Sequence, residues 1–489
     1  MISFAICLVL LVVGYFTYGK FVEKVFAPDD RLTPAVAKAD GVDFIVMPNW
    51  KVFLIQFLNI AGTGPIFGAI MGAKFGPSSY LWIVLGCIFA GAMHDFFIGM
   101  LSMRNNGAGL PAIVGKYLGG KVEKAILVFS VFLLMILGSV FVYSPAEILE
   151  MFGGTTAMWV AAIFAYYIIA TLLPIDKLIG RIYPIFAIAL LFMALGLVVM
   201  LIVKWPAIPE LWHGLGNKAL AVDPTFKDQL FPCLFITIAC GAISGFHATQ
   251  SPLMARCLKS ERMGRPIFYG AMITEGIVAL VWAAVSSYFF YGEPVAGYTL
   301  FEETKALGLS TSAPKVVYLM CEDWLGIAGG ILAVLGVVAA PITSGDTAFR
   351  SARLIIAEVL HFDQKSIHKR LTISIPMFVA CLVLLFWQIG NPDGFNTVWK
   401  YFGWANQTLA VFVLWTITAY LVKHDKPFVL ALIPALFMTT VCSTFLFVSH
   451  QALALPEIVG YPLGIAVLVS SYGWFHIWHS RYVKYNKRS

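Results

Sequence analysis

The chain has 489 residues, of which 60% are hydrophobic and only 12% are charged, and its mean hydropathy is +0.84. This composition excludes the soluble globular class and predicts an all-α polytopic membrane protein embedded in a lipid bilayer. The net charge of +7 is modest and gives no support to a nucleic-acid partner. The eight cysteines contain no CxxC pair, so they indicate neither a disulfide framework nor a zinc site.

Apolar segments follow one another along the whole chain. The segment 1–19 has no basic residue ahead of it and no cleavage site, so we expect a retained helix rather than a signal peptide. Two sets of five segments and then two more follow, each with the roughly 20 residues that a helix needs to cross hydrocarbon. The total is about 13 spans. After a broken segment around 56–68, the predicted spans are 79–103, 124–149, 156–173, 183–204, 231–258, 266–291, 326–356, 369–389, 399–422, 428–448 and 457–479.

The two sets of five predict a five-plus-five inverted repeat. Because each set has an odd number of helices, the second set enters the membrane from the opposite side. The predicted parts are an N-terminal helix and loop (1–50), the first repeat (51–204), an outer loop (205–230), the second repeat (231–423), and two C-terminal helices with a basic tail (424–489).

The positions of the basic residues support this alternation and predict its orientation. Lys and Arg are retained on the cytoplasmic side of a membrane. With a periplasmic N-terminus and a cytoplasmic C-terminus, all but seven of the 33 basic residues fall in cytoplasmic connections. The seven exceptions are Lys74, Lys204, Lys218, Lys227, Lys305, Lys315 and Lys400.

The first repeat opens with an apolar segment that the sequence Gly-Thr-Gly-Pro interrupts. These residues free backbone groups at a depth without bulk water, so the groups must be buried in protein or line a cavity. The N–H groups that start a half-helix attract carboxylates, and unwound carbonyls attract cations. A glycine kink that allows close helix packing is the alternative. The predicted substrate contacts are Asn59, Gly62, Thr63 and Gly64.

A second interrupted segment, 239–252, opens the second repeat, and paired broken helices are typical of secondary transporters. Its polar side chains are too many for a lipid-facing surface, so we expect them to face the protein interior or water. His247 is alternatively a hydrogen-bonded structural residue. Cys240 shares a helical face with His247, but two ligands are too few for a metal site. The predicted substrate contacts here are Ser244, Gly245, His247 and Gln250.

Oxygen atoms in the span 326–356 predict a cation site. Pro341 frees a carbonyl one turn back, and Ala340, Thr343 and Ser344 fall on one helical face. One carbonyl with two hydroxyls suits a dehydrated alkali cation if the first break supplies further ligands. The alternative is that both hydroxyls bond back to their own helix.

Other polar side chains within apolar segments are costly there and indicate function. His94 and Asp95 are candidates for proton coupling, unless they tie the cytoplasmic end of their helix to a loop. Asn406 and Gln407 lie in the outer part of the tenth repeat helix and are candidates for a gate.

Four blocks of this sequence resemble signatures of the carbon starvation protein A (CstA) family. The blocks are Asp40–Asp43, Ile60–Ile66, Leu81–Asp95 and Phe402–Gln407. The resemblance implies a bacterial inner-membrane carrier that is induced when carbon runs short. It implies uptake of peptides or, as in some members, proton-coupled uptake of pyruvate. The family is placed with the amino acid-polyamine-cation transporters, which implies a LeuT-type fold with one extra N-terminal and two extra C-terminal helices.

The same resemblance implies which backbone atoms complete the cation site. The carbonyls of Ile60 and Thr63, together with Ala340, Thr343 and Ser344, match the sodium site that many LeuT-type carriers share.

These observations together predict a secondary-active importer. Its substrate is a small nutrient with a carboxylate, either a peptide or a keto acid such as pyruvate. The coupling ion is H⁺ or Na⁺, and no other cofactor is expected. A membrane sensor that binds a nutrient and a passive channel are the alternatives. An enzyme is not expected, because no nucleophile with a base and no metal cluster stands out.

Overall fold

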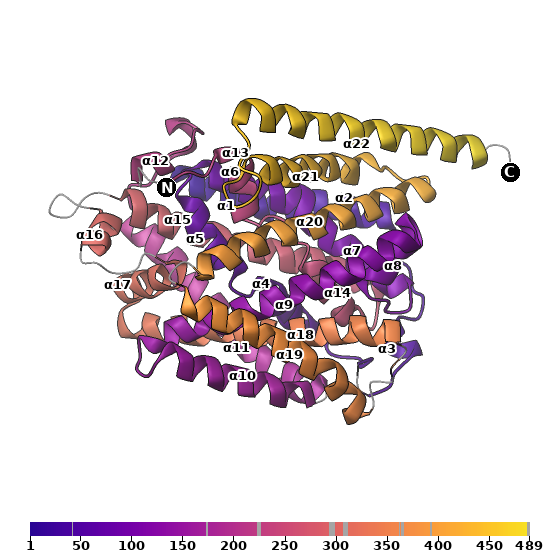
Figure 1. Cartoon of the computed structure of the whole chain (residues 1–489), viewed down its shortest axis with the longest axis horizontal. Coiled ribbons are helices and arrows are strands. Elements are labelled where there is room, and N and C mark those ends of the chain that lie inside the picture. Colours follow the sequence, from indigo (N-terminus) through magenta and orange to yellow (C-terminus); the bar gives the residue numbers. More distant parts are fainter. Residues whose placement is uncertain are drawn as a thin grey trace.

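The computed structural model is built from helices that run mostly along one axis (Figure 1). It describes residues 1–41, 43–172, 175–222, 226–292, 299–306, 312–360, 362, 366–391 and 394–486. Within these ranges no residue belongs to a strand, as the composition predicts.

Helices of the first half follow the predicted apolar segments. Turns between them occur where glycine permits: Gly119 has a φ of 100° and separates α8 from α9. The elements are α1 (Ile2–Phe16), α2 (Tyr18–Phe26), α3 (Pro34–Ala37), α4 (Asn49–Ala61), the π-helix η1 (Gly64–Gly68), α5 (Ala69–Ala73), α6 (Ser78–Gly86), the π-helix η2 (Cys87–Gly91), α7 (Ala92–Arg104), α8 (Leu110–Leu118), α9 (Gly120–Glu150), α10 (Thr156–Leu172) and α11 (Ile175–Lys204).

The second half also follows the predicted segments. Its elements are η3 (Leu211–His213), α12 (Ala219–Val222), α13 (Leu230–Thr237), α14 (His247–Ala255), η4 (Glu261–Met263), η5 (Arg265–Tyr269), α15 (Gly270–Tyr291), α16 (Leu300–Ala306), α17 (Ala313–Ala333), η6 (Val334–Val338), α18 (Ala339–Leu360), α19 (Ile367–Gly390), α20 (Gly394–Lys423), α21 (Val429–Val448) and α22 (Glu457–Asn486).

Among the described residues, every predicted span contains at least one helix. In the described ranges, nine helical runs are long and apolar enough to cross a membrane, and α4 with the following helix forms a further pair bent by 48°. The other predicted spans are shorter or interrupted. They are α10 with 17 residues, the α13–α14 pair, and the α17–η6–α18 run.

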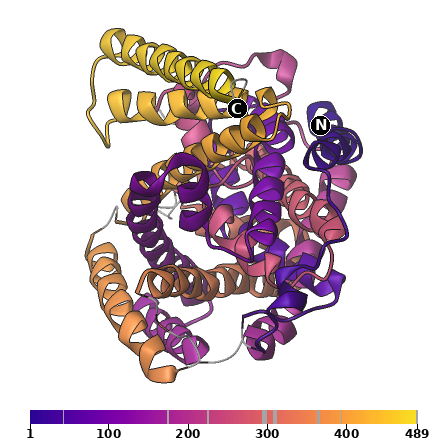
Figure 2. The same ribbon diagram turned by 90° about the vertical axis from the view of Figure 1, so that its right-hand side faces the viewer.

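Burial separates a central helix from a lipid-facing layer. α15 is buried along most of its length and packs against α1, α4 and α5. By contrast, α21 and α22 stack on one side of the bundle (Figure 2), and α22 exposes large apolar side chains such as Ile458 and Trp474. Such exposed apolar surface fits contact with lipid.

The chain ends and loops are distributed over two opposite ends of the bundle. The N-terminus, α12 and α16 lie at one end, whereas α3, α8 and the end of α22 lie at the other (Figure 1). The charge pattern predicts that the α3 end is cytoplasmic.

A buried ion pair fastens the α3 end. Glu261, which is 1% exposed, receives hydrogen bonds from Arg104 Nε at 3.1 Å and from Arg104 Nη2 at 3.0 Å. The backbone N–H of Asp29 donates to the same carboxylate at 3.1 Å. These contacts join α7, the loop after α2 and η4.

A second ion pair at this end is exposed to solvent. Arg262 donates two hydrogen bonds of 2.6 Å to Asp30, and their side chains are 65% and 74% exposed. The bonds from Arg262 hold the pKa of Asp30 below its usual range, so this carboxylate stays ionised at mildly acidic pH.

The two ion pairs give a matched test of what holds this end together. Arg104→Gln removes the cation that donates two hydrogen bonds to the buried Glu261 carboxylate and leaves it only Arg31, whose Nε lies 3.6 Å from Oε1. The free energy of unfolding should therefore fall by about 3 kcal/mol. Arg262→Gln removes an exposed pair and should lower it by no more than about 1 kcal/mol. Thermal unfolding of the detergent-solubilised protein measures both changes. Equal losses of unfolding free energy in the two variants would contradict a stabilising role for the buried ion pair at Glu261.

Candidate functional site

The first predicted interruption is present in the structure. α4 ends at Ala61, and Gly62 takes φ 45° and ψ −137°, a conformation that L side chains rarely adopt. After Thr63 the chain turns into η1, where the N–H groups of Ile66 and Phe67 donate to the Thr63 carbonyl at 3.2 and 2.8 Å. The backbone therefore leaves helical geometry where the Gly-Thr-Gly-Pro sequence predicts it.

The second predicted interruption is present as well. α13 ends at Thr237 and α14 begins at His247, with buried, non-helical chain between them. Gly241 in this stretch has a φ of 90°. The N-terminus of a half-helix is thus formed at His247, inside the protein.

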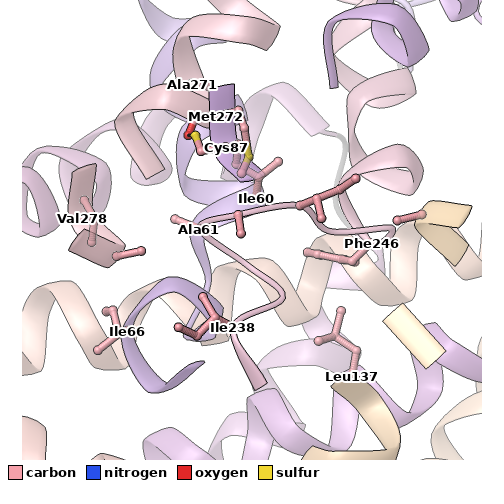
Figure 3. Close-up of a cluster of buried hydrophobic side chains, with 14 of the residues drawn as sticks. Ile60, Ala61, Ile66, Cys87, Leu137, Ile238, Phe246, Ala271, Met272 and Val278 are labelled. Atoms are coloured by element: carbon pink, nitrogen blue, oxygen red, sulfur yellow. Dashed lines mark hydrogen bonds between the residues drawn. The ribbon is translucent and has the colours of Figure 1, made fainter. Parts of the chain in front are cut away.

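The two breaks touch each other. A Cβ atom added to Gly64 would lie 2.3 Å from the Sγ of Cys240, and one added to Gly68 would lie 2.9 Å from the carbonyl oxygen of Thr237. Figure 3 shows Ile60, Ala61 and Ile66 of the first broken helix in one cluster of buried side chains with Ile238 and Phe246 of the second break. Segments about 180 residues apart therefore form one buried region.

The second break is held by an asparagine from α20. Asn406 Oδ1 accepts hydrogen bonds from the Phe246 N–H at 2.6 Å and from Ser244 Oγ at 3.2 Å. Its Nδ2 donates to Ser244 Oγ at 3.0 Å. The next residue, Gln407, donates to the carbonyl of Phe235 in α13 at 2.8 Å. Both residues contact the second broken helix directly, and their role as a gate stays a prediction.

Three buried ionisable side chains form a chain beside the second break. Asp95 in α7 lies 2.8 Å from His94 Nδ1 through one carboxylate oxygen and 2.8 Å from His247 Nδ1 through the other. All three side chains are fully buried. The structure therefore joins the predicted proton-coupling pair to His247, which the sequence assigned to the substrate.

A fourth member of this cluster is Glu275 on α15. One of its oxygens, Oε1, accepts a hydrogen bond from the Gly241 N–H at 3.0 Å, and Oε2 lies 3.4 Å from His247 Nε2. The sequence shows Glu275 only as one carboxylate in an apolar run, so its partners were not predicted. A single carboxylate in the otherwise apolar predicted span 266–291 is costly, and this could have identified Glu275 as a candidate functional residue.

Cys240 brings a sulfur atom to the same place. One ligand atom each from Cys240, His247 and Glu275 lies within 4.8 Å of the other two, a donor set that could hold a zinc ion. The sequence analysis counted only the first two of these residues as ligands. The same imidazole can instead carry a proton between the carboxylates of Asp95 and Glu275.

The first break holds polar side chains that have no hydrogen-bond partner among the residues that the structure describes. Neither side-chain atom of Asn59 has a hydrogen-bond partner, and Thr63 Oγ1 has none, although both residues are fully buried. Gln250 differs, because its Nε2 donates to Thr249 at 2.8 Å and to Ser351 at 3.2 Å. Gln250 Oε1 and His247 Nε2 also lack a partner. Among the predicted substrate contacts with a polar side chain, Asn59 and Thr63 are thus the two whose side chains make no hydrogen bond at all to the described residues.

The predicted cation ligands lie next to the first break. Ser344 Oγ donates to the carbonyl of Leu58 at 2.9 Å and faces Gly62. Thr343 Oγ1 bonds to the carbonyls of Ala339 and Ala340 at 3.0 and 2.8 Å, which is the back-bonded alternative. A sodium ion at Ile60, Thr63 and these hydroxyls stays a prediction.

Sequence comparison places the chain among known transporters. A family model described as carbon starvation protein CstA matches residues 1–151, 142–297 and 301–445. An uncharacterized membrane protein of Haemophilus influenzae is 46% identical over 66% of this chain and 97% of its own length. The peptide transporter CstA of Campylobacter jejuni is 26% identical over 89% of this chain and 78% of its own length. The pyruvate/proton symporter BtsT of Escherichia coli is 30% identical over 58% of this chain and 49% of its own length.

Solved structures share the fold at low sequence identity. A mutant of the Eremococcus coleocola manganese transporter aligns with a TM-score of 0.55 and 13% identity over 91% of this chain and 99% of that chain. MhsT in complex with L-phenylalanine aligns with a TM-score of 0.55 and 14% identity over 86% of this chain and 96% of that chain. Both are LeuT-fold transporters, so the predicted LeuT-type fold is confirmed. Fold and named relatives make secondary transport the general function.

Close packing around the second break can be tested with a pair of glycine substitutions. A Cβ at Gly245 would lie 2.3 Å from the Asn406 carbonyl oxygen and 2.5 Å from the Ala410 nitrogen, whereas a Cβ at Gly473 of α22 meets nothing within 4 Å. Gly245→Ala should therefore lower the free energy of unfolding by about 1–3 kcal/mol. Gly473→Ala should raise it by about 0.5–1 kcal/mol, because alanine favours a helix. Melting curves in detergent measure both, and an unchanged melting temperature for Gly245→Ala would contradict the contact with α20.

Proposed function

The chain belongs to the carbon starvation protein CstA family, and on this premise we propose that it imports a small nutrient that bears a carboxylate. The substrate is a short peptide or a keto acid such as pyruvate, and an inward proton gradient drives its uptake. The membrane is the bacterial inner membrane, with the N-terminus periplasmic and the C-terminus cytoplasmic. Uptake of this kind serves a cell that is short of carbon.

The observation that carries this proposal is the pair of unpartnered side chains at the first break. A buried polar group without a partner costs about 1–3 kcal/mol. Asn59 Nδ2 and the Thr63 hydroxyl are hydrogen-bond donors, and the half-helix that begins at Gly64 presents its positive end close by. These groups together suit a substrate carboxylate, which both a peptide and pyruvate carry.

The side chains of the second break complete the proposed chamber. Phe246 precedes His247, and its ring lies 6.2 Å from the ring of Phe141 in α9. Phe141 in turn faces Gly62 of the first break. Aromatic rings here would cover the apolar part of a small substrate, while Ser244 and Gln250 remain secondary contacts of the proposed site.

The His94–Asp95–His247 chain supports a proton as the coupling ion. It is fully buried and contains an imidazole on each side of one carboxylate, and its His247 is the first residue of the second half-helix. Histidine is the side chain that most readily gains and loses a proton near neutral pH. The name of BtsT, a pyruvate/proton symporter, supports the same ion. Sodium is the second candidate because Ser344 lies against the first break.

Substitution of Asn59 should weaken substrate binding without lowering the stability of the fold. Asn59→Leu removes no side-chain hydrogen bond to any described residue, so the melting temperature should stay the same or rise. The loss of a hydrogen bond to a charged carboxylate should raise the KM for uptake by about 10- to 100-fold. Asn406→Leu is the matched control, since it removes the bonds to Ser244 and Phe246 and should destabilise the fold by about 1–3 kcal/mol. A destabilised Asn59→Leu with an unchanged KM would contradict substrate binding at Asn59.

Uptake by the full-length protein in proteoliposomes tests the proposed function. Labelled pyruvate or a labelled dipeptide should accumulate against its gradient when the outside is acidic, with or without sodium. Asp95→Asn should abolish this accumulation and retain exchange of labelled for unlabelled substrate, because it removes the carboxylate that bridges the two histidines.

The other outcomes of this assay point to other functions. Binding without flux indicates a sensor, and flux that only equilibrates indicates a channel. Accumulation that needs sodium and is lost in Thr343→Ala and Ser344→Ala would replace the proton with sodium at the predicted cation site.

A further inference from the structure

We propose that Cys240, His247 and Glu275 bind a zinc ion that fixes the shape of the second break. This inference goes beyond the proposed function, because it does not depend on the substrate or on the coupling ion. The sequence offers only Cys240 and His247 as neighbouring ligands, and the position of Glu275 on α15 adds the third.

Each of the three side chains offers an atom that zinc prefers: a sulfur, an imidazole nitrogen and a carboxylate oxygen. All three residues are buried. His247 Nε2 and Glu275 Oε2 have no hydrogen-bond partner in the described part of the chain, although both side chains are fully buried. Buried polar atoms in proteins are nearly always satisfied, so two unsatisfied atoms that face each other indicate a site for a cation.

The distances fit tetrahedral coordination. His247 Nε2 and Glu275 Oε2 lie 3.4 Å apart. Zinc bonds of about 2.0–2.2 Å to nitrogen and oxygen place such atoms about 3.3–3.6 Å apart, and a thiolate sulfur bonded at about 2.3 Å lies about 3.6 Å from each of them. One ligand atom of each residue already lies within 4.8 Å of the other two, so the three have to close up by no more than about 1.2 Å.

Neighbouring groups already orient two of the ligands. His247 Nδ1 lies 2.8 Å from the carboxylate of Asp95, which leaves Nε2 for the metal. A carboxylate on the far ring nitrogen is a common partner of a zinc-bound histidine. Glu275 Oε1 accepts the N–H of Gly241 at 3.0 Å, which leaves Oε2 beside the imidazole. The contact between Asp95 and His247 that the proposed function uses is kept when the metal is bound.

Zinc would also balance the charge of these ligands. It binds cysteine as the thiolate, glutamate as the carboxylate and histidine as the neutral imidazole, and the thiol proton leaves for solvent. The two negative charges of Cys240 and Glu275 then match the two positive charges of the ion. Buried charges in proteins are paired or coordinate metals, so a neutral complex suits the interior of an apolar bundle.

The ion would tie both ends of the unwound stretch to α15. Cys240 directly precedes Gly241, which has a φ of 90°, and His247 is the first residue of α14. The third ligand, Glu275, belongs to α15. Cys240 also packs against Gly64 at the start of the first half-helix. Zinc would therefore fix the part of the second break that contacts the first.

Metal analysis of the full-length, untagged protein in detergent tests this site. The wild type should hold about one zinc ion per chain. After zinc is removed with a chelator, added Co²⁺ should give the absorption bands of tetrahedral cobalt with a thiolate charge-transfer band. Added Zn²⁺ should abolish these bands and raise the melting temperature, because an ion that binds only the folded chain stabilises it.

Two cysteine variants separate this site from adventitious binding. Cys240→Ser should abolish the thiolate band and weaken zinc binding by more than the roughly 10- to 100-fold that loss of an outer-shell partner costs. Cys381→Ser is the matched control, because Cys381 is a buried free cysteine on α19 outside the donor set. It should keep the thiolate band and the wild-type affinity for zinc.

Wild-type protein that binds neither ion would overturn the inference and leave His247 Nε2 without a metal. Equal zinc affinity in Cys240→Ser and wild type would also overturn it, as would a cobalt spectrum without a thiolate band. If Cys240→Ser does not fold, Glu275→Gln takes its place in the zinc titration, and an unchanged affinity would overturn the inference. A chain that binds one zinc ion as described but accumulates neither pyruvate nor a dipeptide in proteoliposomes would refute the proposed function and support the zinc site.

Discussion

The structure depends on one constraint: backbone groups freed inside a membrane must find partners, because water is not there to supply them. The chain leaves helical geometry at Gly62 and again between Thr237 and His247, deep in a bundle of apolar helices. At Gly64 and Gly68 the first broken helix packs closely against Cys240 and Thr237 of the second. A continuous helix at either place would satisfy its own backbone and leave no such region.

The two breaks satisfy this constraint in different ways. The second break is completed by the protein, since Asn406 binds its Phe246 N–H and Glu275 binds its Gly241 N–H. At the first break, the side chains of Asn59 and Thr63 have no hydrogen-bond partner in the described part of the chain. This asymmetry fits a division of labour in which the second break responds to the proton and the first receives the substrate. In the proposed carrier, the contact between Cys240 and Gly64 would link these two responses.

The sequence predicted those features of the structure that depend only on residues close together in the chain. Apolar length predicted the spans, and Gly-Thr-Gly-Pro predicted the first break, because both act through neighbouring residues. The partners of polar side chains were not predictable in this way. Asp95 meets His247 across 152 residues and Glu275 meets Gly241 across 34, so only the packing of α7, α14 and α15 brings them together. Likewise, the sequence could not decide whether Thr343 faces a cation or its own helix, and in the structure it bonds to Ala339 and Ala340.

The central claim is that substrate and proton complete one shared buried region, so each should favour binding of the other by the same factor. The most direct measurement is proton uptake by the purified protein in weakly buffered solution when pyruvate or a dipeptide is added, followed with a pH indicator. The account predicts that substrate binding draws protons from solution, and that Asp95→Asn removes this uptake. Saturable substrate binding without any proton exchanged would contradict it.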